Sequence, residues 1–167
     1  KTTASIKRAL LSATRMRPIQ GVRRYVLGIW RHKYDALWSG TIPSWRRILD
    51  PDKGIGEWTG ASPRKAEHKI TFNDGWGPVD VIARFMAFGE AMGPEDLKSI
   101  EFTDVYLNEM DTLDETAQET LIGRVGRDPP EEVSGRPGRI FGDCNSPSLN
   151  SWVYRDFWSE RKPGYHL

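Results

Sequence analysis

Segments typical of strands and segments typical of helices alternate along this chain, and this alternation restricts its fold more than any other feature. Residues 2–16 carry apolar side chains at the spacing of one helical face. Residues 22–31 are rich in Val, Ile and aromatic residues and predict a strand. Similar segments return near the end, with a strand over 138–143 and a helix over 149–161. This order predicts an α/β fold in which helices flank a largely parallel sheet.

The middle of the chain predicts a hairpin inserted between these units. Residues 68–74 and 78–89 predict two strands joined by a Gly-Trp-Gly turn. Ahead of them, a helix over 33–49 is expected to be broken or kinked near Gly40 and Pro43 and to stop at Asp50-Pro51. The other expected elements are a loop over 52–67, a helical turn over 94–99, a strand over 100–107, a helix over 112–124 and a loop over 127–138.

The composition excludes several classes of protein. Apolar residues make up 38% of the 167 positions and charged residues 28%, which argues against a disordered or collagen-like chain. No apolar run approaches the roughly 20 residues needed to span a bilayer. Cys144 is the only cysteine, which rules out an intramolecular disulfide and a cysteine-rich zinc site and favours a reducing, intracellular setting.

The net charge of +1 conceals two zones of opposite sign. Residues 1–47 hold eleven Lys and Arg and a single acid, Asp35, whereas residues 89–132 hold thirteen acids and three bases. The basic zone has the charge to contact the phosphates of a nucleotide or of a nucleic acid. Alternatively, the two zones are solvated surfaces that attract each other in the fold. The charges alone do not decide between these interpretations.

The chain begins with Lys1-Thr2-Thr3 at the head of a basic amphipathic helix. In a phosphate-binding loop, a lysine and a hydroxyl residue lie where the loop becomes a helix, so that the lysine reaches the β- and γ-phosphates and the hydroxyl holds Mg²⁺. The helix N-terminus adds free N–H groups and the positive end of the helix dipole. By themselves these three residues are more typical of a frayed terminus with a threonine cap.

Two apolar strands end in polar residues that are typical of nucleotide sites. One leads into Asn108-Glu109, and ATPases with a catalytic glutamate place one residue of such a pair near Mg²⁺ and the next on the attacking water. The usual first residue is Asp, and here it is Asn. The other strand leads into Asn145, and an amide at this place points into the crevice where open α/β sheets bind ligands. An ordinary strand leaving the core, or an Asn-Ser-Pro turn, would show the same pattern.

Taken together, the order and spacing of these segments resemble the ATPase domain of tailed-phage large terminase subunits, the motors that package viral DNA. The resemblance covers essentially the whole chain. Its parts are Lys-Thr-Thr, HKYDALWSGTIPSW, ITFNDG, VYLNE, GRVGRDPP, IFGDCNSP and SWVYRDFW. VYLNE is similar to the form of the family's second ATPase motif in which Asn replaces Asp, and GDCNSP is similar to the family's coupling motif.

The resemblance implies a P-loop NTPase core of the additional-strand, catalytic-glutamate type, which hydrolyses ATP with Mg²⁺. In such a site Lys1 would contact the β- and γ-phosphates and Thr2 would ligate Mg²⁺, with Thr3 in the same nucleotide-binding segment. Asn108 would lie near Mg²⁺, through water, and Glu109 would activate the hydrolytic water.

Further roles are implied by the same resemblance. Asn145 would sense the γ-phosphate and couple hydrolysis to movement, and Arg31 would line the nucleotide site or the DNA path. Such ring motors also use an arginine supplied by a neighbouring subunit. The candidates for that residue are Lys98, Arg124 and Arg127, although arginines of this kind more often form surface ion pairs.

The resemblance also implies partners and boundaries. The motor would act on double-stranded viral DNA as a ring of subunits on the portal protein, with the small terminase subunit as a further partner, in the host cytoplasm and away from membranes. Residues 1–167 would form one ATPase domain truncated at the phosphate-binding loop. The loop glycines would precede Lys1 and a nuclease domain would follow Leu167, so nuclease activity is not expected from these residues.

Two other functions stay open. A P-loop motor of another kind, such as a helicase or a recombination ATPase, would share these motifs. A non-enzymatic nucleic-acid-binding domain would instead use the basic face and the aromatic residues of residues 1–47. Glycines before Lys1 would favour an ATPase, and a nuclease domain downstream would favour a terminase.

Overall fold

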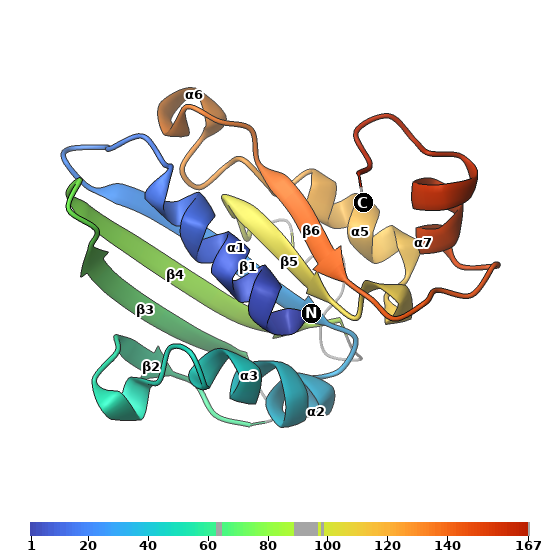
Figure 1. Cartoon of the computed structure of the whole chain (residues 1–167), viewed down its shortest axis with the longest axis horizontal. Helices are drawn as coiled ribbons and strands as arrows, with labels where there is room; N and C mark the ends of the chain where they lie inside the picture. The colour runs from blue at the N-terminus through green and yellow to red at the C-terminus, as the bar shows by residue number, and fades with distance from the viewer. Residues whose placement is uncertain (63–64, 89–96, 98, 167) are drawn as a thin grey trace.

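A six-stranded sheet forms the centre of the molecule (Figure 1). The computed structural model describes residues 1–62, 65–88, 97 and 99–166. The strands are β1 (Arg23–Arg31), β2 (Glu57–Thr59), β3 (Ala66–Asn73), β4 (Pro78–Ala87), β5 (Asp104–Asn108) and β6 (Arg139–Asp143). They lie in the order β2-β3-β4-β1-β5-β6. Strands β4, β1, β5 and β6 are parallel, whereas β3 and β2 are each antiparallel to the inner neighbour. The predicted α/β fold with a largely parallel sheet is therefore confirmed.

Most helices occur where the sequence predicts them, near both ends of the chain, after β1 and after β5, whereas a short one over Glu131–Ser134 lies in a segment predicted to be loop. They are α1 (Thr2–Thr14), α2 (Tyr34–Ala36), α3 (Ile42–Arg46), α5 (Glu115–Ile122), α6 (Glu131–Ser134) and α7 (Trp152–Tyr154), with π-helical turns over Leu37–Thr41 and Arg155–Ser159 and 3-10 turns over Pro51–Lys53 and Met110–Thr112. In the described part of the chain, no helix has the length and apolar character needed to cross a membrane.

The kink expected near Gly40 and Pro43 is confirmed. Gly40 lies in the π-helical turn between α2 and α3, and Pro43 lies in the first turn of α3. A Cβ atom at position 40 would lie 2.5 Å from a guanidinium nitrogen of Arg31. Glycine at this position therefore lets the Arg31 side chain lie against the helical segment.

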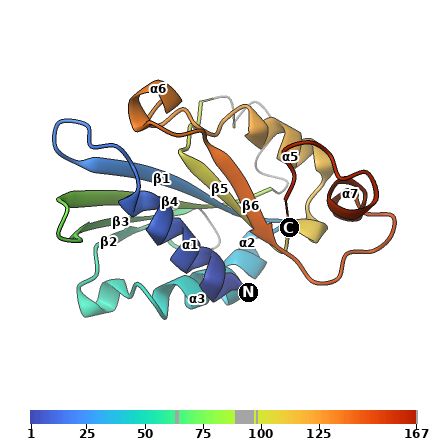
Figure 2. The ribbon, with the colours of Figure 1, turned by 45° about the horizontal axis from the view of Figure 1, so that its top comes forward.

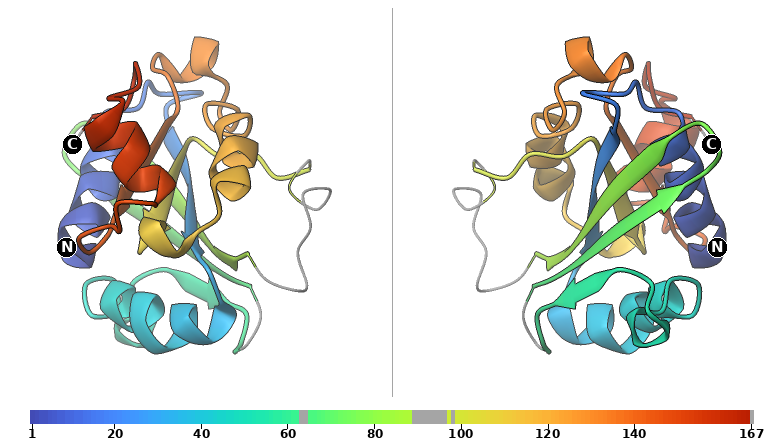
Figure 3. Two further views of the ribbon diagram at one scale, coloured as in Figure 1. Left: turned by 90° about the vertical axis from the view of Figure 1, so that its right-hand side faces the viewer. Right: turned by 90° about the vertical axis from the view of Figure 1, so that its left-hand side faces the viewer.

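Helices cover both faces of the sheet, with α1 on one side and α5 on the other (Figures 2 and 3). The central strand β1 shows how the sequence achieves this. Tyr25, Leu27 and Ile29 belong to the core cluster under α1, whereas Val26 and Trp30 belong to the cluster under α5. Because side chains alternate along a strand, a strand that is apolar at both sets of positions is buried on both faces.

Two short elements lie where the sequence predicts loops. Strand β2 lies inside the segment 52–67, and helix α6 lies inside the segment 127–138. Each has only three or four residues, which is too few to show a hydrophobic period. The prediction of continuous loop in these segments was therefore wrong.

The ends of two elements also differ from the prediction. The strand predicted over 100–107 begins only at Asp104, and the final helix predicted over 149–161 begins at Trp152. The start of the final helix is poorly marked because polar and aromatic residues are mixed in the segment 149–161. The helical turn predicted over 94–99 falls almost entirely outside the described residues.

A buried histidine of β3 links helix α3 to the segment that precedes β2. His68 is 0% exposed, and its Nδ1 accepts a hydrogen bond from Trp45 Nε1 at 2.9 Å. Because an indole nitrogen only donates, the His68 proton is on Nε2, which lies 2.6 Å from the carbonyl oxygen of Ile55 and donates to it. Burial lowers the pKa of His68 below its usual value of 6.5.

We expect the protein to lose stability through His68 as the pH falls below about 6.5. The unfolded chain takes up a proton near the ordinary pKa, whereas the folded ring resists protonation. At acidic pH the unfolded state thus binds more protons than the folded state, so the free energy of unfolding decreases as the pH is lowered. His68→Gln keeps a donor and an acceptor but does not titrate. Urea unfolding at about pH 7.5 and about pH 5.5 should show a smaller loss in the variant than in the wild type. Equal losses would contradict the assignment of His68.

Candidate functional site

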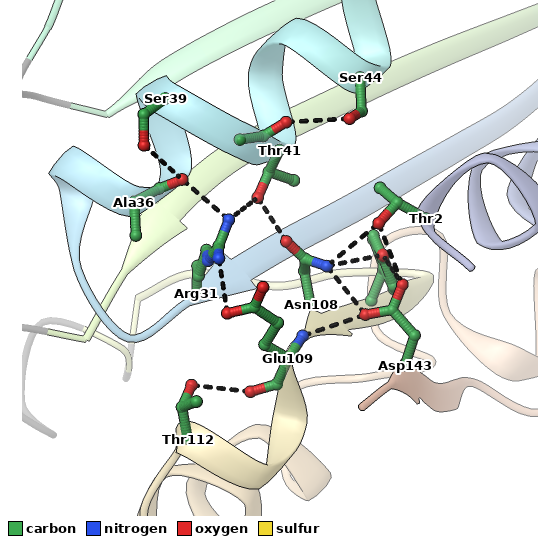
Figure 4. Close-up of polar contacts among 12 residues, drawn as sticks. Thr2, Arg31, Ala36, Ser39, Thr41, Ser44, Asn108, Glu109, Thr112 and Asp143 are labelled. Atoms are coloured by element: carbon green, nitrogen blue, oxygen red, sulfur yellow. Dashed lines mark hydrogen bonds and ion pairs between the residues drawn. The ribbon is translucent and has the colours of Figure 1, made fainter. Parts of the chain in front are cut away.

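Polar side chains from four elements meet at one edge of the sheet (Figure 4). The carboxyl ends of β1, β5 and β6 lie side by side there because these strands are parallel neighbours. The N-terminus of α1 comes to the same edge. We call this group the strand-end cluster, and its members are Thr2, Arg31, Asn108, Glu109 and Asp143. The structure thus brings four residues of the predicted site together and adds Asp143 to them.

Asp143, the last residue of β6, lies at the centre of the strand-end cluster. Its Oδ1 accepts from Asn108 Nδ2 at 2.8 Å and from the backbone N–H of Glu109 at 3.0 Å. Its Oδ2 accepts from the Tyr106 hydroxyl at 2.7 Å and from the Thr2 hydroxyl at 3.2 Å. One carboxylate therefore joins α1, β5 and β6.

Asn108, the last residue of β5, is 3% exposed, and its neighbours fix the orientation of its amide. The amide oxygen accepts from the Thr41 hydroxyl at 2.5 Å, whereas the amide nitrogen faces Asp143 and lies 3.4 Å from the Thr2 hydroxyl oxygen. A carboxylate offers only acceptors, so the amide nitrogen must lie on the Asp143 side. Asn108 therefore meets Thr2 with its nitrogen, and the metal role predicted for Asn108 stays a prediction.

Glu109 has a backbone conformation that is rare for residues other than glycine. Its φ of 54° and ψ of 56° are left-handed. Such conformations cost about 1–3 kcal/mol and cluster at functional sites. Two hydrogen bonds hold the turn, because the Glu109 N–H donates to Asp143 and the Glu109 carbonyl accepts from the Thr112 hydroxyl at 2.7 Å. The chain thus turns sharply after β5 at Glu109, the residue predicted to activate the hydrolytic water.

Arg31 completes the strand-end cluster on the side of β1. One guanidinium nitrogen forms an ion pair with Glu109 at 2.5 Å, and the other donates to the carbonyl oxygen of Ala36 at 2.9 Å. The Arg31 side chain is 14% exposed, whereas the Glu109 side chain is 40% exposed. Glu109 is therefore a partly exposed carboxylate positioned by its own backbone and by one cation.

Tyr106 supports the cluster from within β5. Burial raises the pKa of Tyr106, and the negative charge of Asp143 raises it further. The hydroxyl therefore stays protonated at neutral pH and remains a donor to Asp143.

The other predicted nucleotide-binding residues lie beside the strand-end cluster. The Lys1 ammonium donates to the carbonyl oxygen of Cys144 at 2.6 Å. Asn145 is the next residue along the chain and is exposed, and Thr3 is exposed next to Thr2. Their contacts with a nucleotide stay predictions.

The arginines considered for a role in a neighbouring subunit lie at the other end of β5. The Arg124 carbonyl accepts from the Phe102 N–H, and the Arg127 N–H donates to the Phe102 carbonyl. Phe102 precedes β5, so both arginines are remote from Asn108 in the same chain. Lys98 lies outside the described residues.

The basic and acidic zones of the sequence meet in the fold. Arg24 forms an ion pair with Asp128 at 3.0 Å, and Arg31 forms the ion pair with Glu109. These contacts support the interpretation that the two zones attract each other. Two further arginines of the basic zone pair with acids outside the acidic zone, Arg23 with Asp74 and Arg46 with Asp52.

The strand-end cluster offers few but suitable oxygen ligands for Mg²⁺. The Thr2 hydroxyl and the Asp143 carboxylate are hard oxygen donors, and Mg²⁺ usually keeps several waters and binds through one or two carboxylates and substrate phosphates. Within the described ranges, no group of three or more His, Cys, Asp and Glu residues is placed to hold a metal. The Thr2 hydroxyl and the Asp143 carboxylate are thus oxygen donors of the kind that Mg²⁺ accepts, and the binding of Mg²⁺ stays a prediction.

Sequence reasoning missed three residues of this region, namely Asp143, Thr41 and Tyr106. Asp143 carries the same signal as Asn108, a polar residue at the end of an apolar strand, but the resemblance points to Asn145 in that segment. Thr41 carried no signal, because its hydroxyl reaches Asn108 only through the π-helical turn.

Comparison with known proteins bears on the fold. None of the known protein-family models matches the sequence, and no curated protein matches it. Among solved structures, the large terminase of a thermophilic bacteriophage is similar, with a TM-score of 0.61 at 14% sequence identity. The same terminase in complex with ADP gives a TM-score of 0.56 at 17% identity.

Both alignments cover 86% of this chain and 32% of the terminase chain. This chain thus spans about a third of the length of the terminases that it matches. At such low identity the similarity shows a shared fold, so the six-stranded sheet with flanking helices is similar to the terminase ATPase fold.

Proposed function

We propose that this chain is the ATP-hydrolysing motor domain of a phage terminase large subunit, a P-loop ATPase core that drives double-stranded viral DNA into a procapsid. One observation carries the proposal: the N-terminus of α1 lies against the ends of β1 and β5. Thr2 contacts Asn108 there, and Arg31 pairs with Glu109. A helix N-terminus binds phosphate, and a carboxylate beyond it can act on the attacking water. The terminase-like fold, seen in one case with ADP, supports the same function.

The residues of this chain would promote hydrolysis mainly by positioning the reactants. Lys1 and the free N–H groups of α1 would hold the phosphates. Glu109 would exchange its ion pair with Arg31 for the attacking water and accept a proton from that water. Asn145, on the exposed side, would sense the γ-phosphate. When bound, Mg²⁺ would neutralise charge on the β- and γ-phosphates.

The same proposal assigns partners. The basic surplus of residues 1–47 would contact DNA phosphates, so DNA binding would weaken with salt and show little sequence preference. The motor would form a ring on the portal protein and receive DNA from the small terminase subunit, in the cytoplasm of the host cell.

The complete activity is proposed for a longer protein, because the chain covers 32% of the terminases that it resembles. In that protein the remaining part of the phosphate-binding loop would precede Lys1. A nuclease domain would follow Leu167.

Nucleotide binding by the full-length protein tests the proposal. Lys1→Met should weaken ATP binding roughly 10- to 100-fold, because a charge-assisted contact contributes about 1.5–3 kcal/mol. Lys7→Met is the matched control, since it removes the same charge from an exposed position of α1 that the cluster does not use. Fluorescence titration with a labelled ATP analogue measures both. Absence of ATP binding, or an equal effect of the two substitutions, would contradict the proposal.

The two alternative functions predict different outcomes. A helicase-type motor would couple ATP hydrolysis to separation of DNA strands, whereas a packaging motor would translocate intact duplex. A nucleic-acid-binding domain would bind DNA without hydrolysing ATP. Strand-separation and duplex-translocation assays on the same preparation distinguish these cases.

A further inference from the structure

The ends of β5 and β6 carry an amide and a carboxylate that face each other. Asn108 and Asp143 are register partners in the parallel pair, and their side chains are hydrogen-bonded at 2.8 Å. Asn108 is the residue that sequence reasoning placed near Mg²⁺, yet an amide brings no charge. The negative charge at this pair of strand ends belongs to Asp143.

The amide of Asn108 presents its nitrogen to the Thr2 hydroxyl. Its oxygen is already bonded to the Thr41 hydroxyl at 2.5 Å on the other side. Turning the amide over would place its oxygen against the Asp143 carboxylate, where two acceptors would repel each other. Asn108 is therefore held in an orientation in which it offers no oxygen ligand toward Thr2.

Asp143 makes the contact with Thr2 that a metal-binding hydroxyl needs. The Thr2 hydroxyl has one proton, and it donates that proton to Asp143 Oδ2 at 3.2 Å. The hydroxyl oxygen has two lone pairs, and because the Asn108 amide donates to one of them at 3.4 Å, the other stays free for a cation. The negative charge of the carboxylate also favours a cation at the hydroxyl oxygen.

We propose that Asp143 supplies the carboxylate of a Mg²⁺–nucleotide site at this sheet edge, in the place where Asn108 has only an amide. This inference rests on the proposed ATPase function. Asp143 is a positioning residue, because it acts through the Thr2 hydroxyl. The site needs one carboxylate at this pair of strand ends, and the chain carries it on β6 instead of β5.

The same carboxylate also holds the proposed general base. Asp143 Oδ1 accepts from the backbone N–H of Glu109 at 3.0 Å, while Oδ2 accepts from Thr2. A single side chain thus fixes the left-handed turn of Glu109 relative to the hydroxyl at the α1 N-terminus. Because Asp143 acts on the Thr2 hydroxyl directly, loss of its carboxylate should weaken metal binding even when no hydrolysis takes place.

Metal binding by variants of the full-length protein tests this inference. The probe is Mn²⁺ with a non-hydrolysable ATP analogue, and the readout is the electron paramagnetic resonance signal of free Mn²⁺. Asp143→Asn should raise the half-saturating Mn²⁺ concentration roughly 10- to 100-fold, which is the usual effect of removing a residue that orients a metal ligand. Asp114→Asn, on the exposed surface before α5, removes the same charge elsewhere and should leave the midpoint unchanged.

The decisive variant exchanges the two residues. Asn108→Asp combined with Asp143→Asn keeps an amide–carboxylate pair and moves the charge to β5, so it should restore the Mn²⁺ midpoint to within about threefold of wild type. This variant also decides the question if Asp143→Asn alone does not fold.

Three results would count against the proposals in different ways. If wild type binds no nucleotide-dependent Mn²⁺, the ATPase proposal itself is wrong. If wild type binds Mn²⁺ and Asp143→Asn leaves the midpoint unchanged, Asp143 has no role at the metal. If the exchanged variant folds without recovering the midpoint, the idea of one carboxylate shared between two strand ends is overturned.

Discussion

Replacing Glu109 with Gln is expected to lower steady-state ATP turnover of the full-length protein by at least about 100-fold, since a general base contributes about 10²- to 10⁴-fold. ATP affinity should change by no more than a few-fold. The amide of Gln cannot accept the proton of the attacking water. The contacts proposed between the phosphates and the α1 N-terminus are untouched, so binding should survive.

The structure makes Glu109→Gln a conservative change in every other respect. The backbone N–H at this position still donates to Asp143, and the carbonyl still accepts from Thr112. The side chain is 40% exposed, so no packed core contact is lost. The ion pair with Arg31 becomes a weaker contact with an amide oxygen. Water reaches this contact because the Glu109 side chain is 40% exposed, and Arg31 keeps its hydrogen bond to the carbonyl oxygen of Ala36.

Glu119→Gln is the matched control for this prediction. Glu119 is exposed on α5, so the same chemical change should alter turnover by no more than about twofold. Phosphate release at saturating ATP gives the turnover, and a labelled ATP analogue gives the affinity. A Glu109→Gln protein that hydrolyses ATP at the wild-type rate would remove Glu109 from the mechanism.

Much of the fold could be predicted because its determinants are local in the sequence. The apolar run of β1 and the glycines between β3 and β4 act on their own neighbourhood, and Gly75 and Gly77 both have the positive φ that a tight turn uses. Strand β2 shows the limit of such reasoning. It exists because it pairs with β3 and because Trp58 packs against Phe85, with 5.2 Å between ring centroids. The contact between Trp58 and Phe85 joins segments far apart in the sequence, and three residues are too few to show an alternating pattern of their own.

The candidate site could be predicted in part for a topological reason. Polar residues that end neighbouring parallel strands share one edge of the sheet, so Asn108 and Glu109 meet Arg31 without any knowledge of side-chain contacts. Asp143 ends such a strand too, but its role depends on the register that sets it opposite Asn108. A shift of one residue would have pointed it to the other face. Register is decided by packing across the whole sheet, and the segment alone does not carry it.

The Asp104→Asn variant is expected to lose about 3–5 kcal/mol of the free energy of unfolding, which is the usual cost of removing one partner of a buried ion pair. Asp104 begins β5, and its side chain is 1% exposed. Its carboxylate accepts from the Tyr25 hydroxyl at 2.9 Å, from Arg136 at 2.5 Å and from the backbone N–H of Arg139 at 2.9 Å. This one side chain therefore joins β1, β5 and the start of β6.

Most of the cost should arise at Arg136. Burial and the adjacent carboxylate raise the pKa of Tyr25 well above its usual value, so its hydroxyl remains protonated and can donate to an Asn oxygen as well. The Arg136 guanidinium cannot adapt in this way, because it stays charged at all ordinary pH values and its side chain is only 13% exposed. A neutral Asn leaves it as a nearly buried cation without its counter-ion.

Two comparisons separate this cause from a general loss of charge. Asp52 also binds an arginine, Arg46 at 2.6 Å, but it is 80% exposed, so Asp52→Asn should cost far less. Adding Arg136→Met to Asp104→Asn removes the stranded cation, so the double variant should be more stable than Asp104→Asn alone. Urea unfolding followed by tryptophan fluorescence measures all three. If the double variant gains nothing, the cation is not the source of the cost, and the junction of β5 and β6 depends on the hydrogen bonds of Asp104 to Tyr25 and to the Arg139 backbone.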